Sequence, residues 1–370
     1  MACRVEQLSV LGGVLAAALA APLGAQARWA LEEVVRVGGE DEGLASFNQI
    51  VDVQLGYDGR IWVLDGQTQS IRLFAPDGAP LKEVARRGAG PGEIANANGI
   101  RLGPDGRMWV RDHRNQRLTV FAADGTFDRQ YLVPSHGYGY RWDGTVDAQG
   151  RILDMISVTR GDSRVRVMTR YAPDLSSADT VDLPTTCSDL PPPRSSVASR
   201  RGFTSFPFAA RLVLTLSREG ALWCANSDEY KPRRFPVGAT RHDRQLALDA
   251  PRVPITRAER DAAIAEVDTF LASTGGALEP WDRGSVPRDR GALNWIEGDD
   301  EGRVWVRREL PDRTLAFDVW DASGRRIAVV AAPGRWEFYP LYRIVRGRLV
   351  TIVRDEDDLP YVVVYRIRTP

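Results

Sequence analysis

Hydrophobic and polar positions alternate along much of the chain in short runs, and a Gly-containing turn ends many of these runs. The clearest stretch is 58–78, DGRIWVLDGQTQSIRLFAPDG, in which a polar gap separates two β-rich runs at 60–64 and 71–74. Asp-Gly at both ends is a tight-turn signal, because Gly accepts positive φ and Asp tolerates it. The pattern predicts short antiparallel strands joined by tight turns.

The same pattern returns at 105–125, DGRMWVRDHRNQRLTVFAADG, and in looser form after four further turns. With strands at 50–55 and 79–85, the unit predicts four antiparallel strands per roughly 45 residues, which is typical of a propeller blade. A β-sandwich is the alternative, but it gives no reason for a Trp at a fixed offset from the turn. We therefore predict an all-β, six-bladed β-propeller in a single domain, 28–370, from the six turn glycines at 59, 106, 150, 220, 302 and 347.

The N-terminal segment and the last copy of the repeat complement each other. The last copy supplies only three strands, near 342–345, 349–353 and 361–367, whereas 30–37 (ALEEVVRV) reads as a strand standing alone. A propeller must close its ring or leave a bare strand edge. We expect the N-terminal strand to complete the last blade and close the ring, and a loose N-terminal arm is the alternative.

Two gaps between turn glycines, 150 to 220 and 220 to 302, are longer than the others and predict insertions at about 184–207 and 250–290. The second insertion carries the one strong helix signal. Thr256 and Glu259 form a capping-box pattern, an apolar stripe follows, and Gly275 ends the helix. The predicted helix, 256–273, is either a lid over the channel mouth or a helix packed on the rim.

Charge and the N-terminus indicate where the protein works. The chain has 49 basic and 49 acidic residues, so it has no overall attraction to nucleic acid or to an anionic membrane. An apolar run at 8–23 follows Arg4 and ends in Ala-Gln-Ala, which predicts a signal peptide, 1–27, cleaved after Ala27. We expect a periplasmic or secreted protein without a membrane span after signal removal. An uncleaved anchor is the alternative, but the run is short for a span.

Cleavage leaves two cysteines, Cys187 and Cys224. An exported compartment permits a disulfide, and a bridge between them is predicted to contribute about 3 to 4 kcal/mol at most. A metal or nucleophilic role is disfavoured because no matching His spacing accompanies these residues.

The stretch 88–94, GAGPGEI, followed by DGRMWVRD at 105–112, resembles the linker and strand pair of the NHL-type six-bladed β-propellers. Within that family, the chain resembles in particular the exported bacterial "6-bladed beta-propeller" proteins. The resemblance is sharp over 47–125 and recognisable again over 291–325. It implies a six-bladed fold and export, and it implies no activity, because the family is functionally broad.

Ligands of propellers usually meet the innermost strands around the central channel. Asn98 and Asn294 hold the same repeat position in blades two and five, which face each other across a six-bladed ring. Arg, Asn and carboxylate side chains mixed in this way suit a small anionic or sugar-like ligand, and a water-filled polar channel is the alternative. The candidate channel residues are Asp52, Asn98, Arg101, Asn294, Glu297 and Arg343, with Asp143, Arg141 and Arg211 nearby.

Two functions stay open. The first is a monomeric, non-catalytic binding propeller, without a cofactor, whose partner is an unknown protein or a small ligand. The second is a metal-assisted, lactonase- or lyase-like enzyme with Ca²⁺ or another divalent ion at Glu297, Asn98, Asn294 or Asp52. The six-bladed lactonases place Glu, Asn and Asp at the channel mouth, and this chain does not match that set residue by residue. We therefore favour the binding protein.

Overall fold

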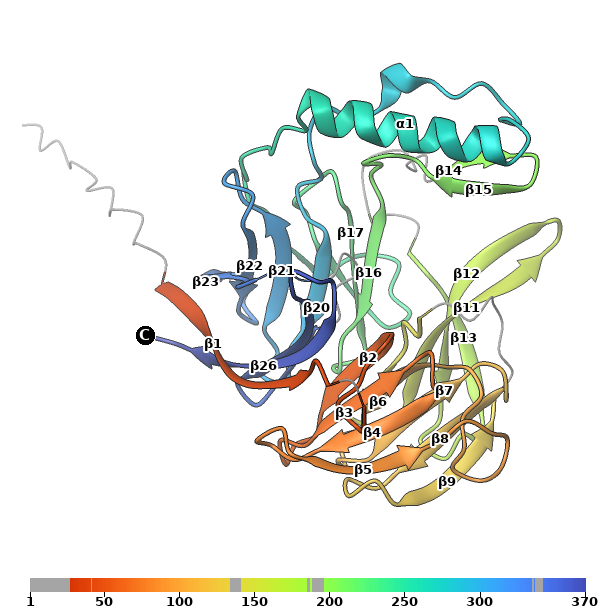
Figure 1. The fold of residues 1–370 in the computed structure, drawn as a ribbon, viewed down its shortest axis with the longest axis vertical. Coiled ribbons are helices and arrows are strands. Elements are labelled where there is room, and N and C mark those ends of the chain that lie inside the picture. The colour runs from red at the N-terminus through yellow and green to blue at the C-terminus, as the bar shows by residue number, and fades with distance from the viewer. Residues whose placement is uncertain are drawn as a thin grey trace, which may run out of the picture.

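The computed structural model describes residues 27–40, 42–133, 141–184, 187, 196–334, 336 and 342–370. They form an all-β propeller with one α-helix (Figure 1). Residues 1–26 of the predicted signal peptide lie outside the described residues.

Four antiparallel sheets of four strands each follow one another in chain order. The first contains β2 (Ile50–Leu55), β3 (Ile61–Asp65), β4 (Ser70–Phe74) and β5 (Pro80–Ala85). The second contains β6 (Ala97–Leu102), β7 (Met108–Asp112), β8 (Arg117–Phe121) and β9 (Phe127–Leu132). The third contains β10 (Thr145–Val146), β11 (Ile152–Arg160), β12 (Ser163–Tyr171) and β13 (Ala178–Asp182). The fourth contains β16 (Leu212–Leu216), β17 (Ala221–Asn226), β18 (Arg233–Pro236) and β19 (Arg244–Gln245).

The remaining large sheet has eight strands in the order β20-β21-β22-β23-β1-β26-β25-β24. One half is β20 (Trp295–Gly298), β21 (Val304–Glu309), β22 (Leu315–Trp320) and β23 (Arg326–Ala331). The other half is β1 (Ala27–Gly38), β26 (Pro360–Arg368), β25 (Arg348–Arg354) and β24 (Tyr342–Val345).

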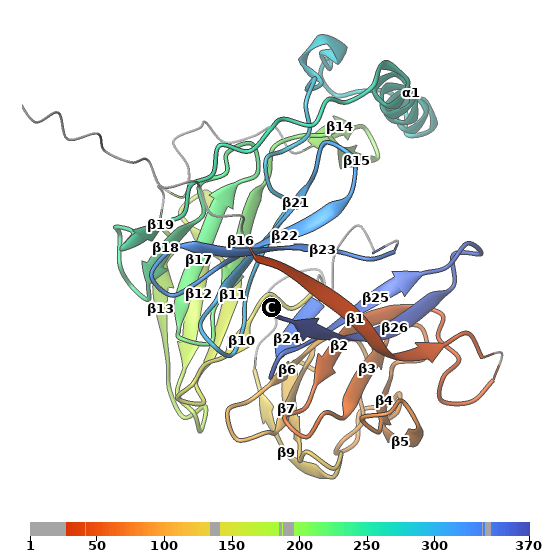
Figure 2. The same cartoon turned by 90° about the vertical axis from the view of Figure 1, so that its left-hand side faces the viewer.

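Strand β1 joins the two halves, as Figure 2 shows where it runs between β23 and β26. It pairs antiparallel with β26 from Ala30 to Gly38, so the N-terminal strand completes the sheet of the last three strands, as the sequence predicts. Its first three residues, Ala27 to Trp29, also pair in parallel with β23. This second pairing was not predicted, and it arises because β1 begins three residues before the expected strand.

The turns follow from the repeated Asp-Gly. Gly59 and Gly106 have φ of +84° and +82°, a region that side chains with a Cβ rarely adopt. The carboxylate of Asp58 accepts a hydrogen bond from the backbone N–H of Arg60 at 3.0 Å, and Asp105 makes the equivalent contact in the second copy. Each side chain thus fixes the tight turn that its glycine permits.

Apolar clusters fill the space between successive sheets. Trp109 packs with Val146 across the second and third sheets, and Leu153 packs with Phe235 across the third and fourth. The largest cluster contains Val53, side chains of β6 and β7, and side chains of β25 and β26. The sheets therefore pack face to face in sequence, and the last packs against the first.

Both predicted insertions hold elements outside the main sheets: the hairpin of β14 (Ser196–Ser199) and β15 (Gly202–Ser205), then α1 (Arg257–Ser273) and the 3₁₀ helix η1 (Arg283–Ser285). The capping box is confirmed, since the Thr256 hydroxyl accepts the N–H of Glu259 and the Glu259 carboxylate accepts the N–H of Thr256. Val267 and Leu271 of α1 pack in one cluster with Val197 of the hairpin. Figures 1 and 2 show α1 lying on this hairpin.

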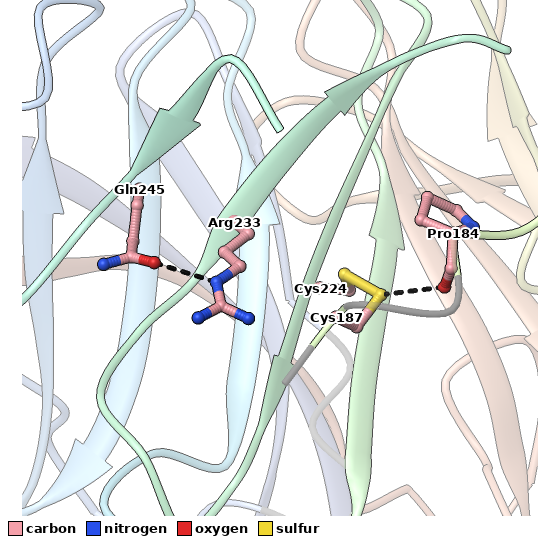
Figure 3. Close-up of a disulfide and its surroundings, with 5 residues drawn as sticks. All are labelled: Pro184, Cys187, Cys224, Arg233 and Gln245. Atoms are coloured by element: carbon pink, nitrogen blue, oxygen red, sulfur yellow. Dashed lines mark hydrogen bonds between the residues drawn. A yellow bond between two sulfur atoms is a disulfide. The ribbon is translucent and has the colours of Figure 1, made fainter. Parts of the chain in front are cut away.

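Cys187 and Cys224 form a disulfide with their Cα atoms 5.6 Å apart (Figure 3). Cys224 lies on the fully buried part of β17, and the carbonyl oxygen of Pro184 lies 3.7 Å from the Sγ of Cys187. The bond ties the segment before the fourth sheet to the centre of that sheet.

Among the described residues, no helix is long and apolar enough to cross a membrane.

Removing the disulfide should destabilise the fold. The double variant Cys187→Ser/Cys224→Ser should lose up to about 4 kcal/mol of unfolding free energy, because the unfolded chain regains the freedom that the 37-residue separation of the bridge removes. Guanidinium denaturation of the oxidised protein and the variant measures the loss. A reducing agent should lower the stability of the wild type and leave the double variant unchanged. Equal stability of the oxidised wild type and the variant would contradict this expectation.

Candidate functional site

A cavity lies where the edge strands of the sheets meet. It is lined by β2, β6, β10 and β16 and by both edge strands of the eight-stranded sheet, β20 and β24. It offers about 70 Å³ to the centres of water molecules, which suits a few waters or a small ligand. None of its described lining residues comes from α1 or from the β14–β15 hairpin. The position of α1 on the hairpin agrees with a helix packed on the rim.

Asp52 of β2 lies fully buried beside this cavity. Its Oδ1 accepts a hydrogen bond from the N–H of Val53 at 3.0 Å, and its Oδ2 accepts one from the N–H of Ile100 at 3.1 Å. The second bond crosses from the first sheet to β6 of the second sheet. Asp52 is therefore a tie between two neighbouring edge strands.

Three guanidinium groups surround the Asp52 carboxylate. Nitrogen-to-oxygen distances are 2.5 Å for Arg101, 3.4 Å for Arg343 and 3.9 Å for Arg141. Burial by itself raises the pKa of the Asp52 carboxyl, but attraction to Arg343, Arg101 and Arg141 and the N–H of Ile100 hold that pKa below its ordinary value. Asp52 is thus a stable anion at neutral pH.

All three guanidinium nitrogens of Arg101 donate hydrogen bonds. Its Nε donates to the carbonyl of Gly144 at 2.7 Å, its Nη1 also donates to the carbonyl of Ile100 at 2.7 Å, and its Nη2 donates to the carbonyl of Trp142. Its guanidinium carbon lies 5.2 Å from the centre of the Trp142 ring. With the ion pair to Asp52, these contacts link the first two sheets to the segment directly before β10 and hold the Arg101 guanidinium in one place.

Arg141 and Glu297 also line the cavity. Arg343 Nη1 is 3.6 Å from a carboxylate oxygen of Glu297, and the indole N–H of Trp295 donates to the same oxygen at 3.4 Å. The guanidinium carbon of Arg141 is 5.6 Å from the Trp295 ring centre. Burial and repulsion from Arg343 and Arg101 lower the pKa of Arg141 to about 10, against the attraction of Asp52. Arg141 therefore stays protonated at pH 7 in a setting that favours a further anion.

The structure brings four of the predicted channel residues together: Asp52, Arg101, Glu297 and Arg343. Asp143 also lines the cavity, where its carboxylate accepts a hydrogen bond from Arg166.

The two asparagines are not among the described lining residues. Asn294 accepts a hydrogen bond from Arg307 Nε at 2.7 Å through its side chain and one from Arg211 at 2.8 Å through its backbone carbonyl. The backbone carbonyl of Asn98 accepts the N–H of Trp142 at 2.9 Å. Asn98 lies at a register shift between Ala97 and Gly99, which takes it out of the regular ladder.

Sequence reasoning missed the aromatic part of the site. Trp142, Trp295 and Tyr342 stand beside the charged residues, and the Tyr342 hydroxyl is buried without a hydrogen-bond partner among the described residues. Burial raises the pKa of Tyr342 well above its ordinary value, so the phenol is neutral. A search for aromatic residues next to the polar positions of each predicted inner strand would have found Trp295, which follows Asn294 directly.

Within the described part of the chain, no group of three or more His, Cys, Asp or Glu side chains is arranged to hold a metal ion.

No family model matches this chain, and no curated protein matches it in sequence. Solved structures of the same fold do exist. A member of the DUF4221 family from Bacteroides vulgatus is 12% identical, with a TM-score of 0.53 over 93% of this chain and 100% of that one. A protein of Bacteroides fragilis described as exported is 11% identical, with a TM-score of 0.52 over 94% of this chain and 98% of that one. These likenesses show the fold alone.

Virginiamycin B lyase from Staphylococcus aureus is also similar, at 12% identity over 92% of this chain and 99% of that one. Its TM-score of 0.45 is too low to bear on the function of this chain.

Replacing Asp52 should destabilise the folded protein. Asp52→Asn removes the anion from among three arginines and should cost about 3 to 5 kcal/mol of unfolding free energy, as other broken buried ion pairs do. The folded-state pKa of Asp52 is lowered, so its contribution is present above about pH 4 and is lost as the pH falls further. The difference between wild type and variant should therefore be large at pH 7 and should shrink toward pH 3.

Chemical denaturation at the two pH values measures this difference. Asp261→Asn, on the exposed surface of α1, is the matched control and should change stability by less than about 0.5 kcal/mol. A pH-independent loss in the Asp52 variant would show that shape, and not charge, accounts for the role of Asp52.

Proposed function

We propose that this protein is an exported, six-bladed β-propeller that binds a small anionic ligand in its central channel and catalyses no reaction. The main support for this proposal is the excess of positive charge in the cavity.

Six blades are the natural division of the sheets. The eight-stranded sheet has two edge strands at the cavity, β20 and β24, whereas each four-stranded sheet has one. Its halves are joined through three parallel pairs between β1 and β23, while β1 pairs with β26 over most of its length. Dividing the sheet between β23 and β1 gives two further four-stranded blades.

Positive charge dominates the cavity. Four arginines line it against two carboxylates, those of Asp143 and Glu297, and the buried Asp52 stands behind them. Asp143 is paired with Arg166, which is outside the lining. In a narrow, poorly solvated cavity this excess attracts anions more strongly than the same charges in water would. The arginines of the lining are Arg101, Arg141, Arg218 and Arg343.

The same charges disfavour the metal-assisted enzyme. Its proposed ligands include Asp52 and Glu297, and arginines already pair with both carboxylates. A divalent cation there would meet the repulsion of three guanidiniums. Asn98 and Asn294, which would complete that metal site, are not among the described lining residues.

Export rests on the sequence and on one neighbour. The apolar run at 8–23 and the Ala-Gln-Ala that follows it favour a cleaved signal peptide. The Bacteroides fragilis protein of the same fold is described as exported. A disulfide between Cys187 and Cys224 suits an oxidising compartment.

Arg141 is the residue to change for the binding test, because it lies farther from Asp52 than Arg101 and Arg343 do. Arg141→Gln should weaken the binding of succinate, butyrate and inorganic phosphate about tenfold or more, the effect of losing a charge-assisted contact of about 1.5 kcal/mol. Isothermal titration calorimetry with the mature protein at low salt measures the affinities. Arg257→Gln, an exposed arginine of α1, should leave them unchanged. Failure of all three anions to bind the wild type would overturn the proposed function.

Export makes a separate prediction. The full chain produced in a bacterial host should be recovered outside the cytoplasm, beginning at Arg28 and with Cys187 and Cys224 oxidised. Mass spectrometry of the intact protein and of its peptides measures both features. A chain that starts at residue 28 should remain in the cytoplasm. Recovery of the full chain in the cytoplasm would contradict export, and recovery of the uncleaved chain in the membrane fraction would contradict cleavage.

A further inference from the structure

Three side chains meet at the turns that follow the edge strands β2, β16 and β24. Tyr57 follows β2, Arg218 follows β16 and Arg346 follows β24. Arg218 Nη2 donates to the Tyr57 hydroxyl, and Arg346 Nη1 donates to the Tyr57 carbonyl at 2.9 Å. The guanidinium carbons of Arg218 and Arg346 lie 5.4 Å and 4.9 Å from the centre of the Tyr57 ring. Tyr57 therefore contacts the guanidinium groups of both Arg218 and Arg346.

Arg218 reaches across the channel to make these contacts. It belongs to the fourth sheet, whereas Tyr57 belongs to the first, and 161 residues separate the two in the sequence. Its Nη2 is also 3.4 Å from the carbonyl of Leu102 in the second sheet, and its side chain lines the cavity. The guanidinium thus stands in the mouth of the channel, and not on the outer surface.

The partners of these two guanidiniums are neutral throughout the described residues. They are the hydroxyl, ring and carbonyl of Tyr57 and the carbonyl of Leu102. The nearby Asp300 carboxylate accepts the backbone N–H of Arg346 at 3.1 Å and makes no ion pair with its guanidinium. Arg101 and Arg343, by contrast, are paired with Asp52. Two cations with neutral partners at a partly exposed mouth are suited to bind an anionic group.

The arginines around Asp52 lie close to the arginines around Tyr57. Leu102, whose carbonyl lies near Arg218, is the residue directly after Arg101, and one residue of a strand spans roughly 3.3 Å. Both Arg101 and Arg218 line the same small cavity. Arg141 lines this cavity too, so a ligand held by Arg141 has Arg218 in the same cavity lining, with Arg346 beside Arg218 around Tyr57.

We propose that Arg218 and Arg346 form a second anion contact at this mouth, so that the channel selects a small ligand with two anionic groups over one with a single anionic group. This inference rests on the proposed anion-binding function and specifies the class of its ligand. Tyr57 holds the two guanidiniums in place. A dianion then exchanges these neutral contacts for charge-assisted ones.

Succinate and butyrate test the inference, because they have the same number of carbons and differ by one carboxylate. Calorimetry on the wild type at low salt should give at least a tenfold preference for succinate. Arg218→Gln/Arg346→Gln should reduce the preference to about threefold or less, because succinate binding weakens more than butyrate binding does. Arg346→Glu, at an exposed position, should weaken succinate further and leave the fold intact. Arg257→Gln should change neither affinity.

The outcomes separate the two proposals. Loss of the succinate preference in the Arg218 and Arg346 variants, with succinate binding weakened more than butyrate binding, supports the second contact. Equal binding of the two acids by the wild type, or a preference that survives in the double variant, overturns the second contact and leaves the anion site of Arg141 standing. Binding of inorganic phosphate without binding of either acid would also overturn the second contact and leave the anion site of Arg141 standing. Failure of the wild type to bind any of the three overturns both.

Discussion

The ring of sheets needs one joint where its beginning meets its end, and β1 is that joint. A row of unpaired backbone groups at either edge would invite pairing with another chain. Strand β1 covers one edge by its antiparallel pairing with β26 and the other by its three parallel pairs with β23. Trp29 adds an edge-on contact with Trp305, with ring centres 6.0 Å apart. The positions of β20 and β24, and hence the shape of the cavity between them, depend on this closure.

A second tie acts at the centre, through Asp52. Taking a carboxylate out of water is costly, and only close cations and N–H donors offset that cost. Arg101 and Arg343 supply the cations from the second sheet and from β24. The ion cluster thus joins three sheets around the cavity, and two of the arginines that stabilise the centre also contribute to the positive charge of the cavity. Arg101 and Arg343 are therefore unsuited to a simple test of binding, since their removal leaves Asp52 buried with fewer partners.

The sequence predicts the elements well because their signals are local. Asp58-Gly59 and its copies mark the turns, 30–37 marks the closing strand, and Thr256 with Glu259 marks the start of the helix. The site is harder to predict because side-chain direction is not local. Asn98 falls at a register shift that the repeat does not reveal, and the contact of Arg218 with Tyr57 joins residues 161 positions apart. The repeat places residues on the inner strands and leaves open which of them reach the cavity.

The distribution of charge gives a protein with no net charge a locally positive cavity, as the proposed anion binding requires. The 49 basic and 49 acidic residues cancel over the whole chain, so long-range steering is weak. Salt largely screens the interaction between exposed charges that are more than roughly 8 Å apart, so an approaching anion responds mainly to the local excess of positive charge. That excess lies inside the channel, where screening is least, and at its mouth, where Arg346 is exposed. Under the proposed function, affinity therefore depends on the cavity arginines, and an anion gains from them only when it is small enough to enter between the edge strands.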